Sequence, residues 1–359
     1  MKTKIPFILI TLLLLSCNRS ELYDKASRSE NFEAGYRKAI TVQNDYVDAD
    51  LYEFPLLVVI QNDPDIGERA ESDGSDVYFT DSDGSPLKHE IEFFEVTGDQ
   101  ANAILWVRVP TIYSSTGTEI YIYYGGSPNS NNNPKDVWDI NFMGVWHLNE
   151  DGDATTDEYK DSTAKNNHGT GGAGTLALTP IAVYGKISKG QEFDATDDYI
   201  DCGNDASVNM NSAMTLEAWI YPYSIAAGRI ISKWGATAGY EIDISSNNAR
   251  FSLNQTIIAQ SGLVASTWQH VAATWDGANF KLFINGTEVD NGTYAGPITD
   301  STNHLFIGRM ANLAPSVMDG IIDEVRISNV RRPDAWIKFE YHNVIEPDNE
   351  LIWGTEENP

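Results

Sequence analysis

Residues 268–289 read WQHVAATWDGANFKLFINGTEV, and this stretch decides the fold class. Its two apolar runs are joined by Asp276-Gly277, and the second run ends at Asn285-Gly286. Asp-Gly and Asn-Gly between apolar runs are the strongest short signals of a β-hairpin, because tight hairpin turns require positive φ angles. The stretch therefore predicts antiparallel hairpins.

The sequence on either side continues in the same style. Short apolar segments rich in β-branched and aromatic residues alternate with turn residues, as expected of strands. The predicted strands in this half are 144–148, 216–221, 229–232, 240–244, 249–253, 270–275, 280–284, 305–307 and 321–327. Many short strands with regular turns favour a sandwich or jelly roll. One short helix is predicted from Pro333 to Tyr341, because proline is favoured near helix starts.

The first half is also predicted to be all β. Its strands are predicted within residues 36–124, at 56–60, 77–79, 91–94, 104–109 and 119–124. The stretch GGSPNSNNNPKD at 125–136 has little to bury and marks a domain boundary. The expected organisation is an all-β chain of two β-sandwich domains, at 33–126 and 141–359, joined by a linker at 127–140.

Six motifs in order give the second half a resemblance to a known family. They are VWHLNEDGD (145–153), YKDSTAKNNHG (159–169), GQEFDATDDYIDCG (190–203), MTLEAWIYP (214–222), the opening stretch, and MDGIIDEVRISNVRR (318–332). Together they resemble a laminin-G-like domain of the concanavalin A-like lectin/glucanase superfamily. The resemblance implies a concanavalin A-like jelly roll and a binding role, often for carbohydrate, without naming the ligand.

The first half resembles the family called domain of unknown function 2341. The resemblance rests on DGSDVYFTDSDGSPLKHEIEFF (73–94), ILWVRVP (104–110) and EIYIYYG (119–125). Pairing of these two families is common in exported bacterial proteins.

The first 17 residues indicate export and lipid attachment. Lys2 and Lys4 precede an apolar run of signal-peptide length at 5–15, which is too short to span a bilayer. The run ends in LLSC, which resembles the lipobox of bacterial lipoproteins and implies cleavage before Cys17 and acylation of its thiol. Residues 1–16 are then a signal peptide and 17–32 a polar tether. The alternative is an ordinary secretory signal that ends by chance in a cysteine. We expect a lipid-anchored protein of the bacterial cell envelope, at the outer membrane, facing the periplasm or the surface.

Charge and cysteine content limit the classes of binding partner and of covalent cross-link that we expect. The formal charge is −28, so phosphate backbones would repel the chain, and nucleic acid is excluded as the expected partner. Cys202 is the only cysteine besides Cys17, so no intramolecular disulfide is expected after processing. The acidity has two interpretations: solubility of an exported protein, or carboxylates that bind Ca²⁺.

Four residues are candidates for ligand binding. Glu241 and Asp243 lie in GYEIDIS (239–245), and strand alternation puts both on one sheet face. Related glycosidases use an E-x-D-x-(x)-E strand there, but Ser245, Ser246 and Asn247 occupy the place of the last glutamate, so catalysis is not expected. Trp234, in a glycine-containing loop, and Tyr240 are the candidates for an exposed aromatic platform that stacks on a sugar.

The calcium candidates are taken from the resemblance. Laminin-G-like relatives often bind one Ca²⁺ with an early acidic or amide loop and late acids, and the matching positions are Asp161, Asn166 and Asn167 with Asp323 and Glu324. Two alternatives stay open: Asp161 and Asn167 form side-chain turns, and Glu324 pairs with nearby Arg326.

The expected function is that of an envelope-anchored, non-catalytic protein that binds glycan through its C-terminal jelly roll. The first alternative is a structural or adhesive surface protein that contacts other proteins. The second alternative is that the protein is a glycoside hydrolase.

Overall fold

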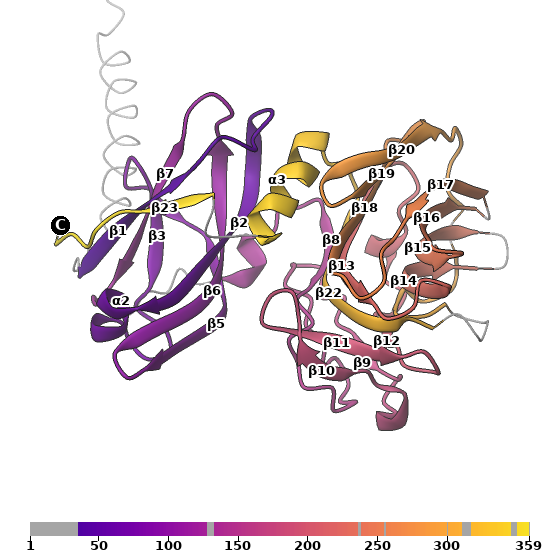
Figure 1. Cartoon of the computed structure of the whole chain (residues 1–359), viewed down its shortest axis with the longest axis horizontal. Helices are drawn as coiled ribbons and strands as arrows, with labels where there is room; N and C mark the ends of the chain where they lie inside the picture. Colours follow the sequence, from indigo (N-terminus) through magenta and orange to yellow (C-terminus); the bar gives the residue numbers. More distant parts are fainter. Residues whose placement is uncertain are drawn as a thin grey trace, which may run out of the picture.

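The computed structural model describes residues 35–127, 133–235, 238–254, 256–299, 301–310, 317–345 and 350–358. Within these ranges the chain forms two β-sandwich domains side by side, as expected (Figure 1). No helix of the described ranges is both long and apolar enough to cross a membrane. The predicted signal peptide, Cys17 and the tether lie outside the described residues.

The N-terminal sandwich has a five-stranded sheet of order β23-β1-β7-β3-β4 and a three-stranded sheet of order β2-β6-β5. The strands are β1 (Tyr36–Val42), β2 (Leu51–Asp63), β3 (Tyr78–Asp81), β4 (Pro86–Leu87), β5 (His89–Thr97), β6 (Gln100–Ile112), β7 (Thr118–Tyr124) and β23 (Leu351–Trp353). The short helix α2 (Pro64–Arg69) follows β2 and is capped by Asp63, whose carboxylate accepts from the N–H groups of Asp65 and Ile66.

The C-terminal sandwich has larger sheets. One has the order β10-β11-β22-β13-β18-β19-β20, with β8 also paired to β22, and the other has the order β17-β16-β15-β14-β21-β12-β9. The first holds β8 (Phe142–Trp146), β10 (Ile181–Tyr184), β11 (Lys189–Asp194), β13 (Met214–Pro222), β18 (Gln269–Trp275), β19 (Asn279–Ile284), β20 (Thr287–Thr293) and β22 (Asp319–Ser328). The second holds β9 (Thr170–Gly171), β12 (Ile200–Asp201), β14 (Ala227–Trp234), β15 (Gly239–Ser245), β16 (Asn248–Leu253), β17 (Thr256–Gly262) and β21 (Phe306–Ile307).

The hairpins predicted from the turn residues are present. β18 pairs with β19 and β19 with β20, all antiparallel. Asn285 and Gly286 both have positive φ, 53° and 69°, as a two-residue hairpin turn of this kind requires. The strand β20 was not predicted, because its residues are mostly exposed and polar and give no apolar run.

The predicted helix is α3 (Asp334–Ile345), a little longer than expected. It starts directly after Pro333, with Asp334 in its first turn, where an acid suits the helix dipole. Trp336 and Phe339 of α3 pack on Phe54 of β2, with ring centroids 4.7 and 5.1 Å apart. The helix therefore lies between the two domains (Figure 1).

The apolar interior forms two clusters. One lies between the two sheets of the C-terminal sandwich. The other fills the N-terminal sandwich and continues through α3 to Trp219, Ala272 and Phe283, on the outer face of the eight-stranded sheet. The second cluster is therefore shared by both domains.

The last residues of the range expected for the C-terminal domain, 141–359, pack instead on the N-terminal domain. Residues 351–353 form β23, which pairs with β1 at the edge of the N-terminal sheet, with Ile40 opposite Trp353. Arg69 and Tyr124 both contact Glu356, at 2.9 and 3.1 Å. The chain therefore returns to its first domain after completing the second. The segment LIWGTEENP is too short to show this by its pattern alone.

Candidate functional site

The two outer faces of the C-terminal sandwich have different neighbours. The eight-stranded sheet faces α3 and the N-terminal domain, through side chains such as Trp219, whose ring stacks on Tyr341 of α3 at 5.6 Å. The seven-stranded sheet, with β14 to β17, lies on the side of the molecule away from the N-terminal domain (Figure 1). The N-terminal domain therefore covers the outer face of the eight-stranded sheet and leaves that of the seven-stranded sheet uncovered.

Strand alternation sets which side chains this outer face carries. Ile200, Ile231 and Ile307 are paired across β12, β21 and β14 and belong to the core. Their neighbours in sequence point the other way, because successive side chains of a strand alternate between faces. The outer face thus carries Phe306 and Ser232 opposite each other, with Glu241 opposite Ser232 on the next strand.

Two acids and two arginines form the centre of this outer face. Asp243 accepts from Arg250 Nε at 3.0 Å and lies 3.2 Å from Arg229 Nη1. Arg229 Nε is also 3.1 Å from Glu241 Oε2, which accepts from Ser232 at 3.2 Å. The acid side chains are 5% and 0% exposed, against 12% for Arg229 and 20% for Arg250. The carboxylates thus lie beneath a layer of guanidinium groups.

Burial sets the protonation of Glu241. Loss of solvent raises its pKa to about 7, while the nearby Arg229 acts in the opposite direction. Burial therefore favours the protonated form of Glu241 more than it does for an exposed glutamate.

Aromatic side chains flank this centre: Tyr199 directly precedes β12, and Phe306 lies on β21. The guanidinium of Arg309 lies over the Tyr199 ring, 3.8 Å from its centroid, and Tyr199 packs edge-on against Phe306 at 5.8 Å. His304 stacks on Phe306 and its Nδ1 is 2.8 Å from Asp201 Oδ1. We call this surface, from Tyr199 and Phe306 to Arg250, the outer-sheet face.

Three of the four predicted ligand residues share the outer-sheet face. Trp234, Glu241 and Asp243 alternate with core positions on β14 and β15, and Trp234 is half-buried at the end of its strand. Tyr240 is a correction. It is buried in the core, and its hydroxyl donates to the Val208 carbonyl at 2.9 Å. An exposed Tyr240 is incompatible with Glu241 and Asp243 on the outer face, because adjacent strand residues point to opposite sides.

Sequence reasoning missed the arginines that complete the outer-sheet face. Arg229 and Arg250 are opposite Asp243 on the two neighbouring strands, and this register depends on a bulge between Arg229 and Ile231. The alternation within β16 was readable and would have placed Arg250 outward. The position of Arg250 opposite Asp243 could not be predicted, because strand pairing cannot be deduced from the sequence of one segment.

The Asp161 loop binds its own N–H groups. The Asp161 carboxylate accepts from the N–H groups of Val145 and Thr163 at 3.0 and 2.9 Å. It also accepts from the Thr163 hydroxyl and the Asn167 N–H, at 2.9 and 2.7 Å. The side chain of Asn167 donates to the Met143 carbonyl at 2.6 Å, and Asn166 pairs with Lys135. This is the side-chain turn arrangement that the sequence left open.

Asp323 is satisfied in the same way. Its carboxylate accepts from the N–H groups of Lys186 and Ile187 at 2.7 and 2.9 Å, and from that of Glu324 at 2.8 Å. The contacts of Asp161 and those of Asp323 share no residue. Donors already cover these oxygens, and a cation would have to replace them, so the five predicted residues do not fit one Ca²⁺ site.

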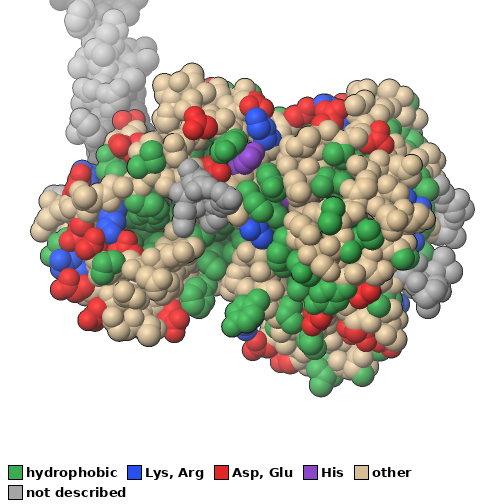
Figure 2. Space-filling view, in the orientation of Figure 1, with side chains coloured by type: hydrophobic (Ala, Val, Ile, Leu, Met, Phe, Trp, Pro, Cys, Tyr) green, Lys and Arg blue, Asp and Glu red, His purple; other side chains and the backbone are tan. Residues whose placement is uncertain are grey.

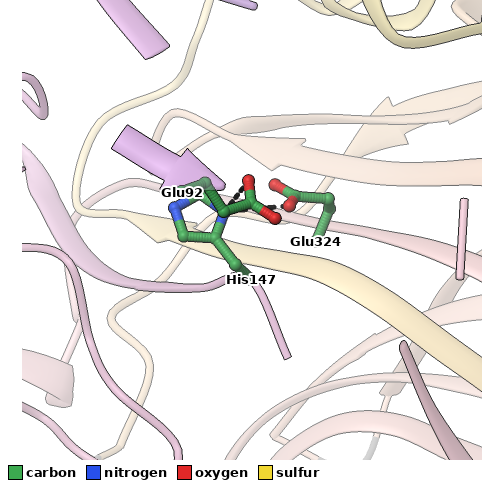
Figure 3. A group of neighbouring side chains, drawn as sticks. All are labelled: Glu92, His147 and Glu324. Atoms are coloured by element: carbon green, nitrogen blue, oxygen red, sulfur yellow. Dashed lines mark hydrogen bonds and ion pairs between the residues drawn. The ribbon is translucent and has the colours of Figure 1, made fainter. Parts of the chain in front are cut away.

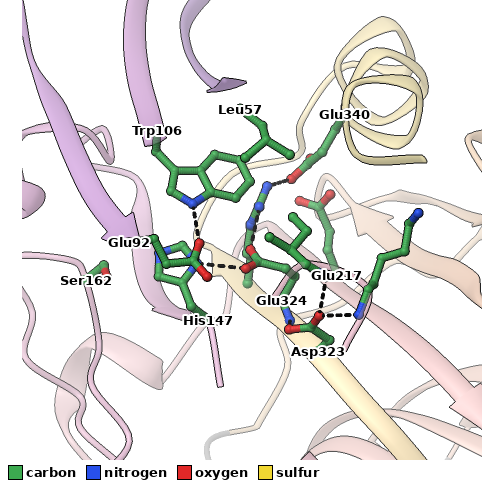
Figure 4. Close-up of polar contacts among 12 residues, drawn as sticks. Leu57, Glu92, Trp106, His147, Ser162, Glu217, Asp323, Glu324 and Glu340 are labelled. Atoms are coloured by element: carbon green, nitrogen blue, oxygen red, sulfur yellow. Dashed lines mark hydrogen bonds and ion pairs between the residues drawn. The ribbon is translucent and has the colours of Figure 1, made fainter. Parts of the chain in front are cut away.

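Glu324 instead belongs to a buried polar network where the domains meet (Figure 4). We call this network the interdomain seam. The N-terminal domain contributes Glu90, Glu92 and Trp106, and the C-terminal domain contributes Trp138, His147, Ser162, Glu324, Arg326 and Glu340. Its polar groups are buried.

Specific contacts hold the interdomain seam together. Trp106 Nε1 donates to Glu92 at 2.8 Å, and Trp138 Nε1 donates to Glu90 at 2.8 Å. Arg326 Nη2 donates to Glu324 at 2.7 Å, and its guanidinium lies over the Trp106 ring at 4.5 Å. Indole donors and a guanidinium thus satisfy acids that burial would otherwise make costly.

The acids control the charge of His147. Burial alone would lower the pKa of His147, but Glu324, Glu92 and Glu90 together raise it well above the usual range. Burial raises the pKa of Glu92 to about 7, and His147 acts against this shift.

The N-terminal sandwich carries a shallow groove of about 320 Å³. Its lining includes Asp81, Asp83, Tyr113, Thr116 and Glu119, and Tyr113 is 47% exposed. The groove lies in a different domain from every residue predicted to bind ligand.

These observations define the class: an all-β protein in which a jelly-roll sandwich is joined to a second sandwich through a buried seam. Residues 194–338 match the family described as Concanavalin A-like lectin/glucanases superfamily, and residues 73–167 match Domain of unknown function (DUF2341). Both resemblances drawn from the sequence are confirmed. The second match extends beyond the first domain into the segment that carries His147 and Asp161. No curated protein matches the sequence.

Three solved structures are similar to part of the chain. The binding domain of Paraclostridial Mosquitocidal Protein 1 has 15% identity and a TM-score of 0.44, covering 56% of this chain and 52% of that one. Domain 4 of AbnA, an arabinanase from Geobacillus stearothermophilus in complex with arabinotriose, has 16% identity and a TM-score of 0.43, covering 55% and 97%. The binding domain of botulinum neurotoxin DC in complex with SialylT has 14% identity and a TM-score of 0.40, covering 57% and 52%. The chain thus spans about half the length of the first and third. These similarities do not identify a ligand for this chain.

Proposed function

We propose that the protein is a non-catalytic glycan-binding protein and that the glycan binds on the outer-sheet face of the C-terminal jelly roll. The observation that carries the proposal is the position of this face. It belongs to the sheet that does not pack on the N-terminal domain. It presents Trp234, two arginines above buried acids, and Arg309 above the Tyr199 ring. The match to a superfamily described by its lectins and glucanases supports the same proposal.

The chemistry of the face suits a hydroxyl-rich ligand. Guanidinium groups present several N–H donors in a fixed plane, which can bind neighbouring hydroxyl or carboxylate oxygens of a sugar. The half-buried indole of Trp234 offers a flat apolar surface for the C–H face of a pyranose ring. A few polar groups placed around an aromatic surface are typical of small-ligand sites.

The acids of the face support binding rather than hydrolysis. A retaining glycosidase needs two carboxyl groups about 5 Å apart, one acting as nucleophile and the other as proton donor. Glu241 is paired with Arg229, and Asp243 lies between two guanidinium groups. Ser245 stands where a further acid would complete the strand pattern. We therefore propose that both acids serve to hold the arginines in position.

A glycan array tests this proposal. Wild-type protein is expected to bind at least one polysaccharide, and Trp234→Ala and Arg309→Ala are expected to weaken that binding at least tenfold. Tyr184→Ala is the matched control, because Tyr184 is 94% exposed but lies on β10 of the other sheet. If the folded wild-type protein binds no glycan, the proposal fails. Loss of binding in Tyr113→Ala, with Trp234→Ala unchanged, would move the site to the groove of the N-terminal domain.

A second candidate function, adhesion to other proteins, is favoured by the edge strand β10. Ile181 and Tyr184 are 58% and 94% exposed there. An open edge with exposed apolar side chains can add a strand from a partner. Binding to an envelope or host-surface protein extract that Ile181→Lys abolishes, with glycan binding absent, would support this function over the first.

We also propose that Cys17 carries the lipid anchor at the bacterial envelope. The support is the signal-like run that ends at this cysteine. Labelled palmitate is expected to be incorporated by wild-type protein expressed in a bacterium and not by Cys17→Ser. Equal labelling of the two proteins would refute the anchor without touching the proposal on glycan binding.

A further inference from the structure

Three residues from both domains converge within the interdomain seam. Glu92 comes from β5, His147 follows β8, and Glu324 comes from β22 (Figure 3). His147 Nδ1 is 2.8 Å from Glu324 Oε1 and 3.5 Å from Glu92 Oε2. One ligand atom from each residue lies within 4.8 Å of the other two.

These distances are close to those around a metal ion. Tetrahedral Zn²⁺ has ligands at about 2.0–2.2 Å, so neighbouring ligand atoms are roughly 3.3 Å apart. The two measured separations bracket this value. Small rotations of the carboxylates would bring all three groups to bonding distance around one point.

The group is buried and incompletely satisfied. The side chains of His147, Glu92 and Glu324 are 6%, 1% and 1% exposed. Glu92 Oε1 is buried and has no hydrogen-bond partner among the described residues, and the same holds for His147 Nε2. A buried carboxylate oxygen without a donor is costly, so it favours a cation beside it.

The outer contacts resemble those that orient metal ligands. Trp106 Nε1 donates to Glu92 Oε2, the oxygen that lies 3.5 Å from His147 Nδ1, and Oε1 of the same carboxylate has no hydrogen-bond partner among the described residues. Arg326 donates to Glu324 Oε2, while Oε1 faces the imidazole. Such second contacts fix ligand direction in known metal sites.

Charge in the interdomain seam also favours a cation. Six acids with buried side chains gather here, and the basic groups in contact with them include Arg326, His147 and His270. The acids are Glu90, Glu92, Glu217, Asp323, Glu324 and Glu340. Buried carboxylates in excess of their basic partners are unfavourable as anions, and burial accordingly raises the pKa values of Glu92, Glu217 and Asp323. Zn²⁺ bound in place of the Nδ1 proton of a charged His147 would reduce this excess by one.

We propose that Glu92, His147 and Glu324 form a buried site for one Zn²⁺ ion that joins the two domains. The mixture of one imidazole nitrogen and carboxylate oxygens suits Zn²⁺ rather than Ca²⁺, which prefers oxygen alone. The ion binds Nδ1 of a neutral His147, so the proton on Nδ1 is released to solvent. Nε2 keeps its hydrogen and faces Glu90 Oε1, at 3.6 Å. The site is separate from the outer-sheet face and independent of glycan binding.

Metal content and thermal stability test the site in the full-length protein. Protein freed of metal by a chelator and dialysed against Zn²⁺ is expected to retain one ion per chain by elemental analysis, and its Tm is expected to rise. His147→Gln and Glu92→Gln are expected to retain at least tenfold less Zn²⁺. His304→Gln is the matched control, because His304 also pairs with a carboxylate, Asp201, but is exposed and far from the seam.

Anomalous scattering at the zinc edge from wild-type crystals gives a second measurement that does not depend on the variants folding. A peak is expected among Glu92, His147 and Glu324. Failure of folded wild-type protein to retain Zn²⁺, equal retention by His147→Gln, or a peak elsewhere would each overturn the proposal. Equal retention of Ca²⁺ would overturn the assignment of the metal class.

Discussion

Single buried groups determine much of the stability of this protein, and Asp161 is an example. Its carboxylate accepts four hydrogen bonds and ties the 161–167 loop to β8. An anionic acceptor with N–H and O–H donors on both oxygens forms stronger hydrogen bonds than a neutral one. The loop therefore takes its shape from one side chain.

We predict that Asp161→Asn destabilises the protein by about 3 kcal/mol, because an amide NH₂ group would face N–H donors that lose their acceptor. Urea unfolding of the two proteins measures the difference. Calcium is expected to leave the Tm of wild-type protein unchanged. A calcium-dependent rise in Tm that disappears in Asp161→Asn would show instead that this loop holds the ion.

A second prediction at this scale concerns pH. His89 is buried, and burial lowers its pKa to about 4. An unfolded histidine binds its proton near pH 6.5, so between pH 6.5 and 4 the unfolded chain takes up more protons than the folded one. Stability is therefore lost as pH falls through this window, by about 3 kcal/mol in total for this group.

Urea unfolding at pH 7 and pH 4.5 checks the His89 prediction. His89→Gln is expected to lose less stability than wild-type protein over this interval, because glutamine does not titrate. His270 serves as a comparison, since burial lowers its pKa to about 4 as well. Identical pH dependence in wild-type protein and His89→Gln would contradict the prediction.

At the scale of elements, α3 connects the two sandwiches. Trp336 contacts Phe54 of the N-terminal domain, and its indole donates to Glu340 at 3.2 Å. Asn343 of the same helix exchanges two hydrogen bonds with the backbone of Leu57, at 2.8 and 3.1 Å. One helix thus adds both apolar and polar contacts with β2.

Trp336→Ala is expected to lower the free energy of unfolding by about 3–5 kcal/mol, because it removes a buried ring from the shared core. Chemical unfolding followed by circular dichroism measures the loss. Lys338→Ala, on the exposed side of α3 where Lys338 pairs with Asp48, is expected to cost less than about 1 kcal/mol. Similar losses in the two variants would show that α3 is not part of the core.

Sequence patterns predicted where the strands lie better than which strands pair with each other. Alternation and Asn-Gly or Asp-Gly turns located β13, β18, β19 and β22, because these strands bury one or both faces. The edge strands β10, β17 and β20 were missed, because mostly exposed strands need no apolar alternation. The outer-sheet face was half predicted: alternation grouped Glu241 with Asp243, but the arginines beside them depend on pairing between distant segments.

The interdomain seam could not have been predicted. Glu92, His147 and Glu324 are separated by many residues, and each sits among residues that give no metal-ligand spacing. Their proximity follows from the packing of β5 against the outer face of the eight-stranded sheet. No local pattern encodes the docking of one domain on another.

At the scale of the whole molecule, the two sandwiches share one apolar cluster and one polar seam. Separating them would expose Trp219 and Phe283, and it would remove Glu92 from His147 and Trp106 from Arg326. The formal charge is −28, and on the face that Figure 2 shows, acidic side chains are spread over both domains rather than gathered in one patch.

Differential scanning calorimetry is therefore expected to show a single cooperative transition for the full-length protein, with calorimetric and van't Hoff enthalpies in agreement. Two resolved transitions would mean that the seam contributes little to stability. An Arg326→Met variant refines the experiment: loss of the guanidinium that binds Glu324 and Glu340 is expected to lower the Tm and to separate the two transitions.

The pairing of β23 with β1 also sets an order for biosynthesis. One edge of β1 obtains its hydrogen-bond partner only when residues 351–353 have been translated, more than 300 residues later. Until then a nascent or prematurely terminated chain carries an open strand edge, the kind of surface that recruits other strands. The jelly roll can fold first, as an insertion, while the sandwich that precedes it on the ribosome stays unfinished. Completion of the N-terminal sheet thus requires that the jelly roll between β1 and β23 has already been translated.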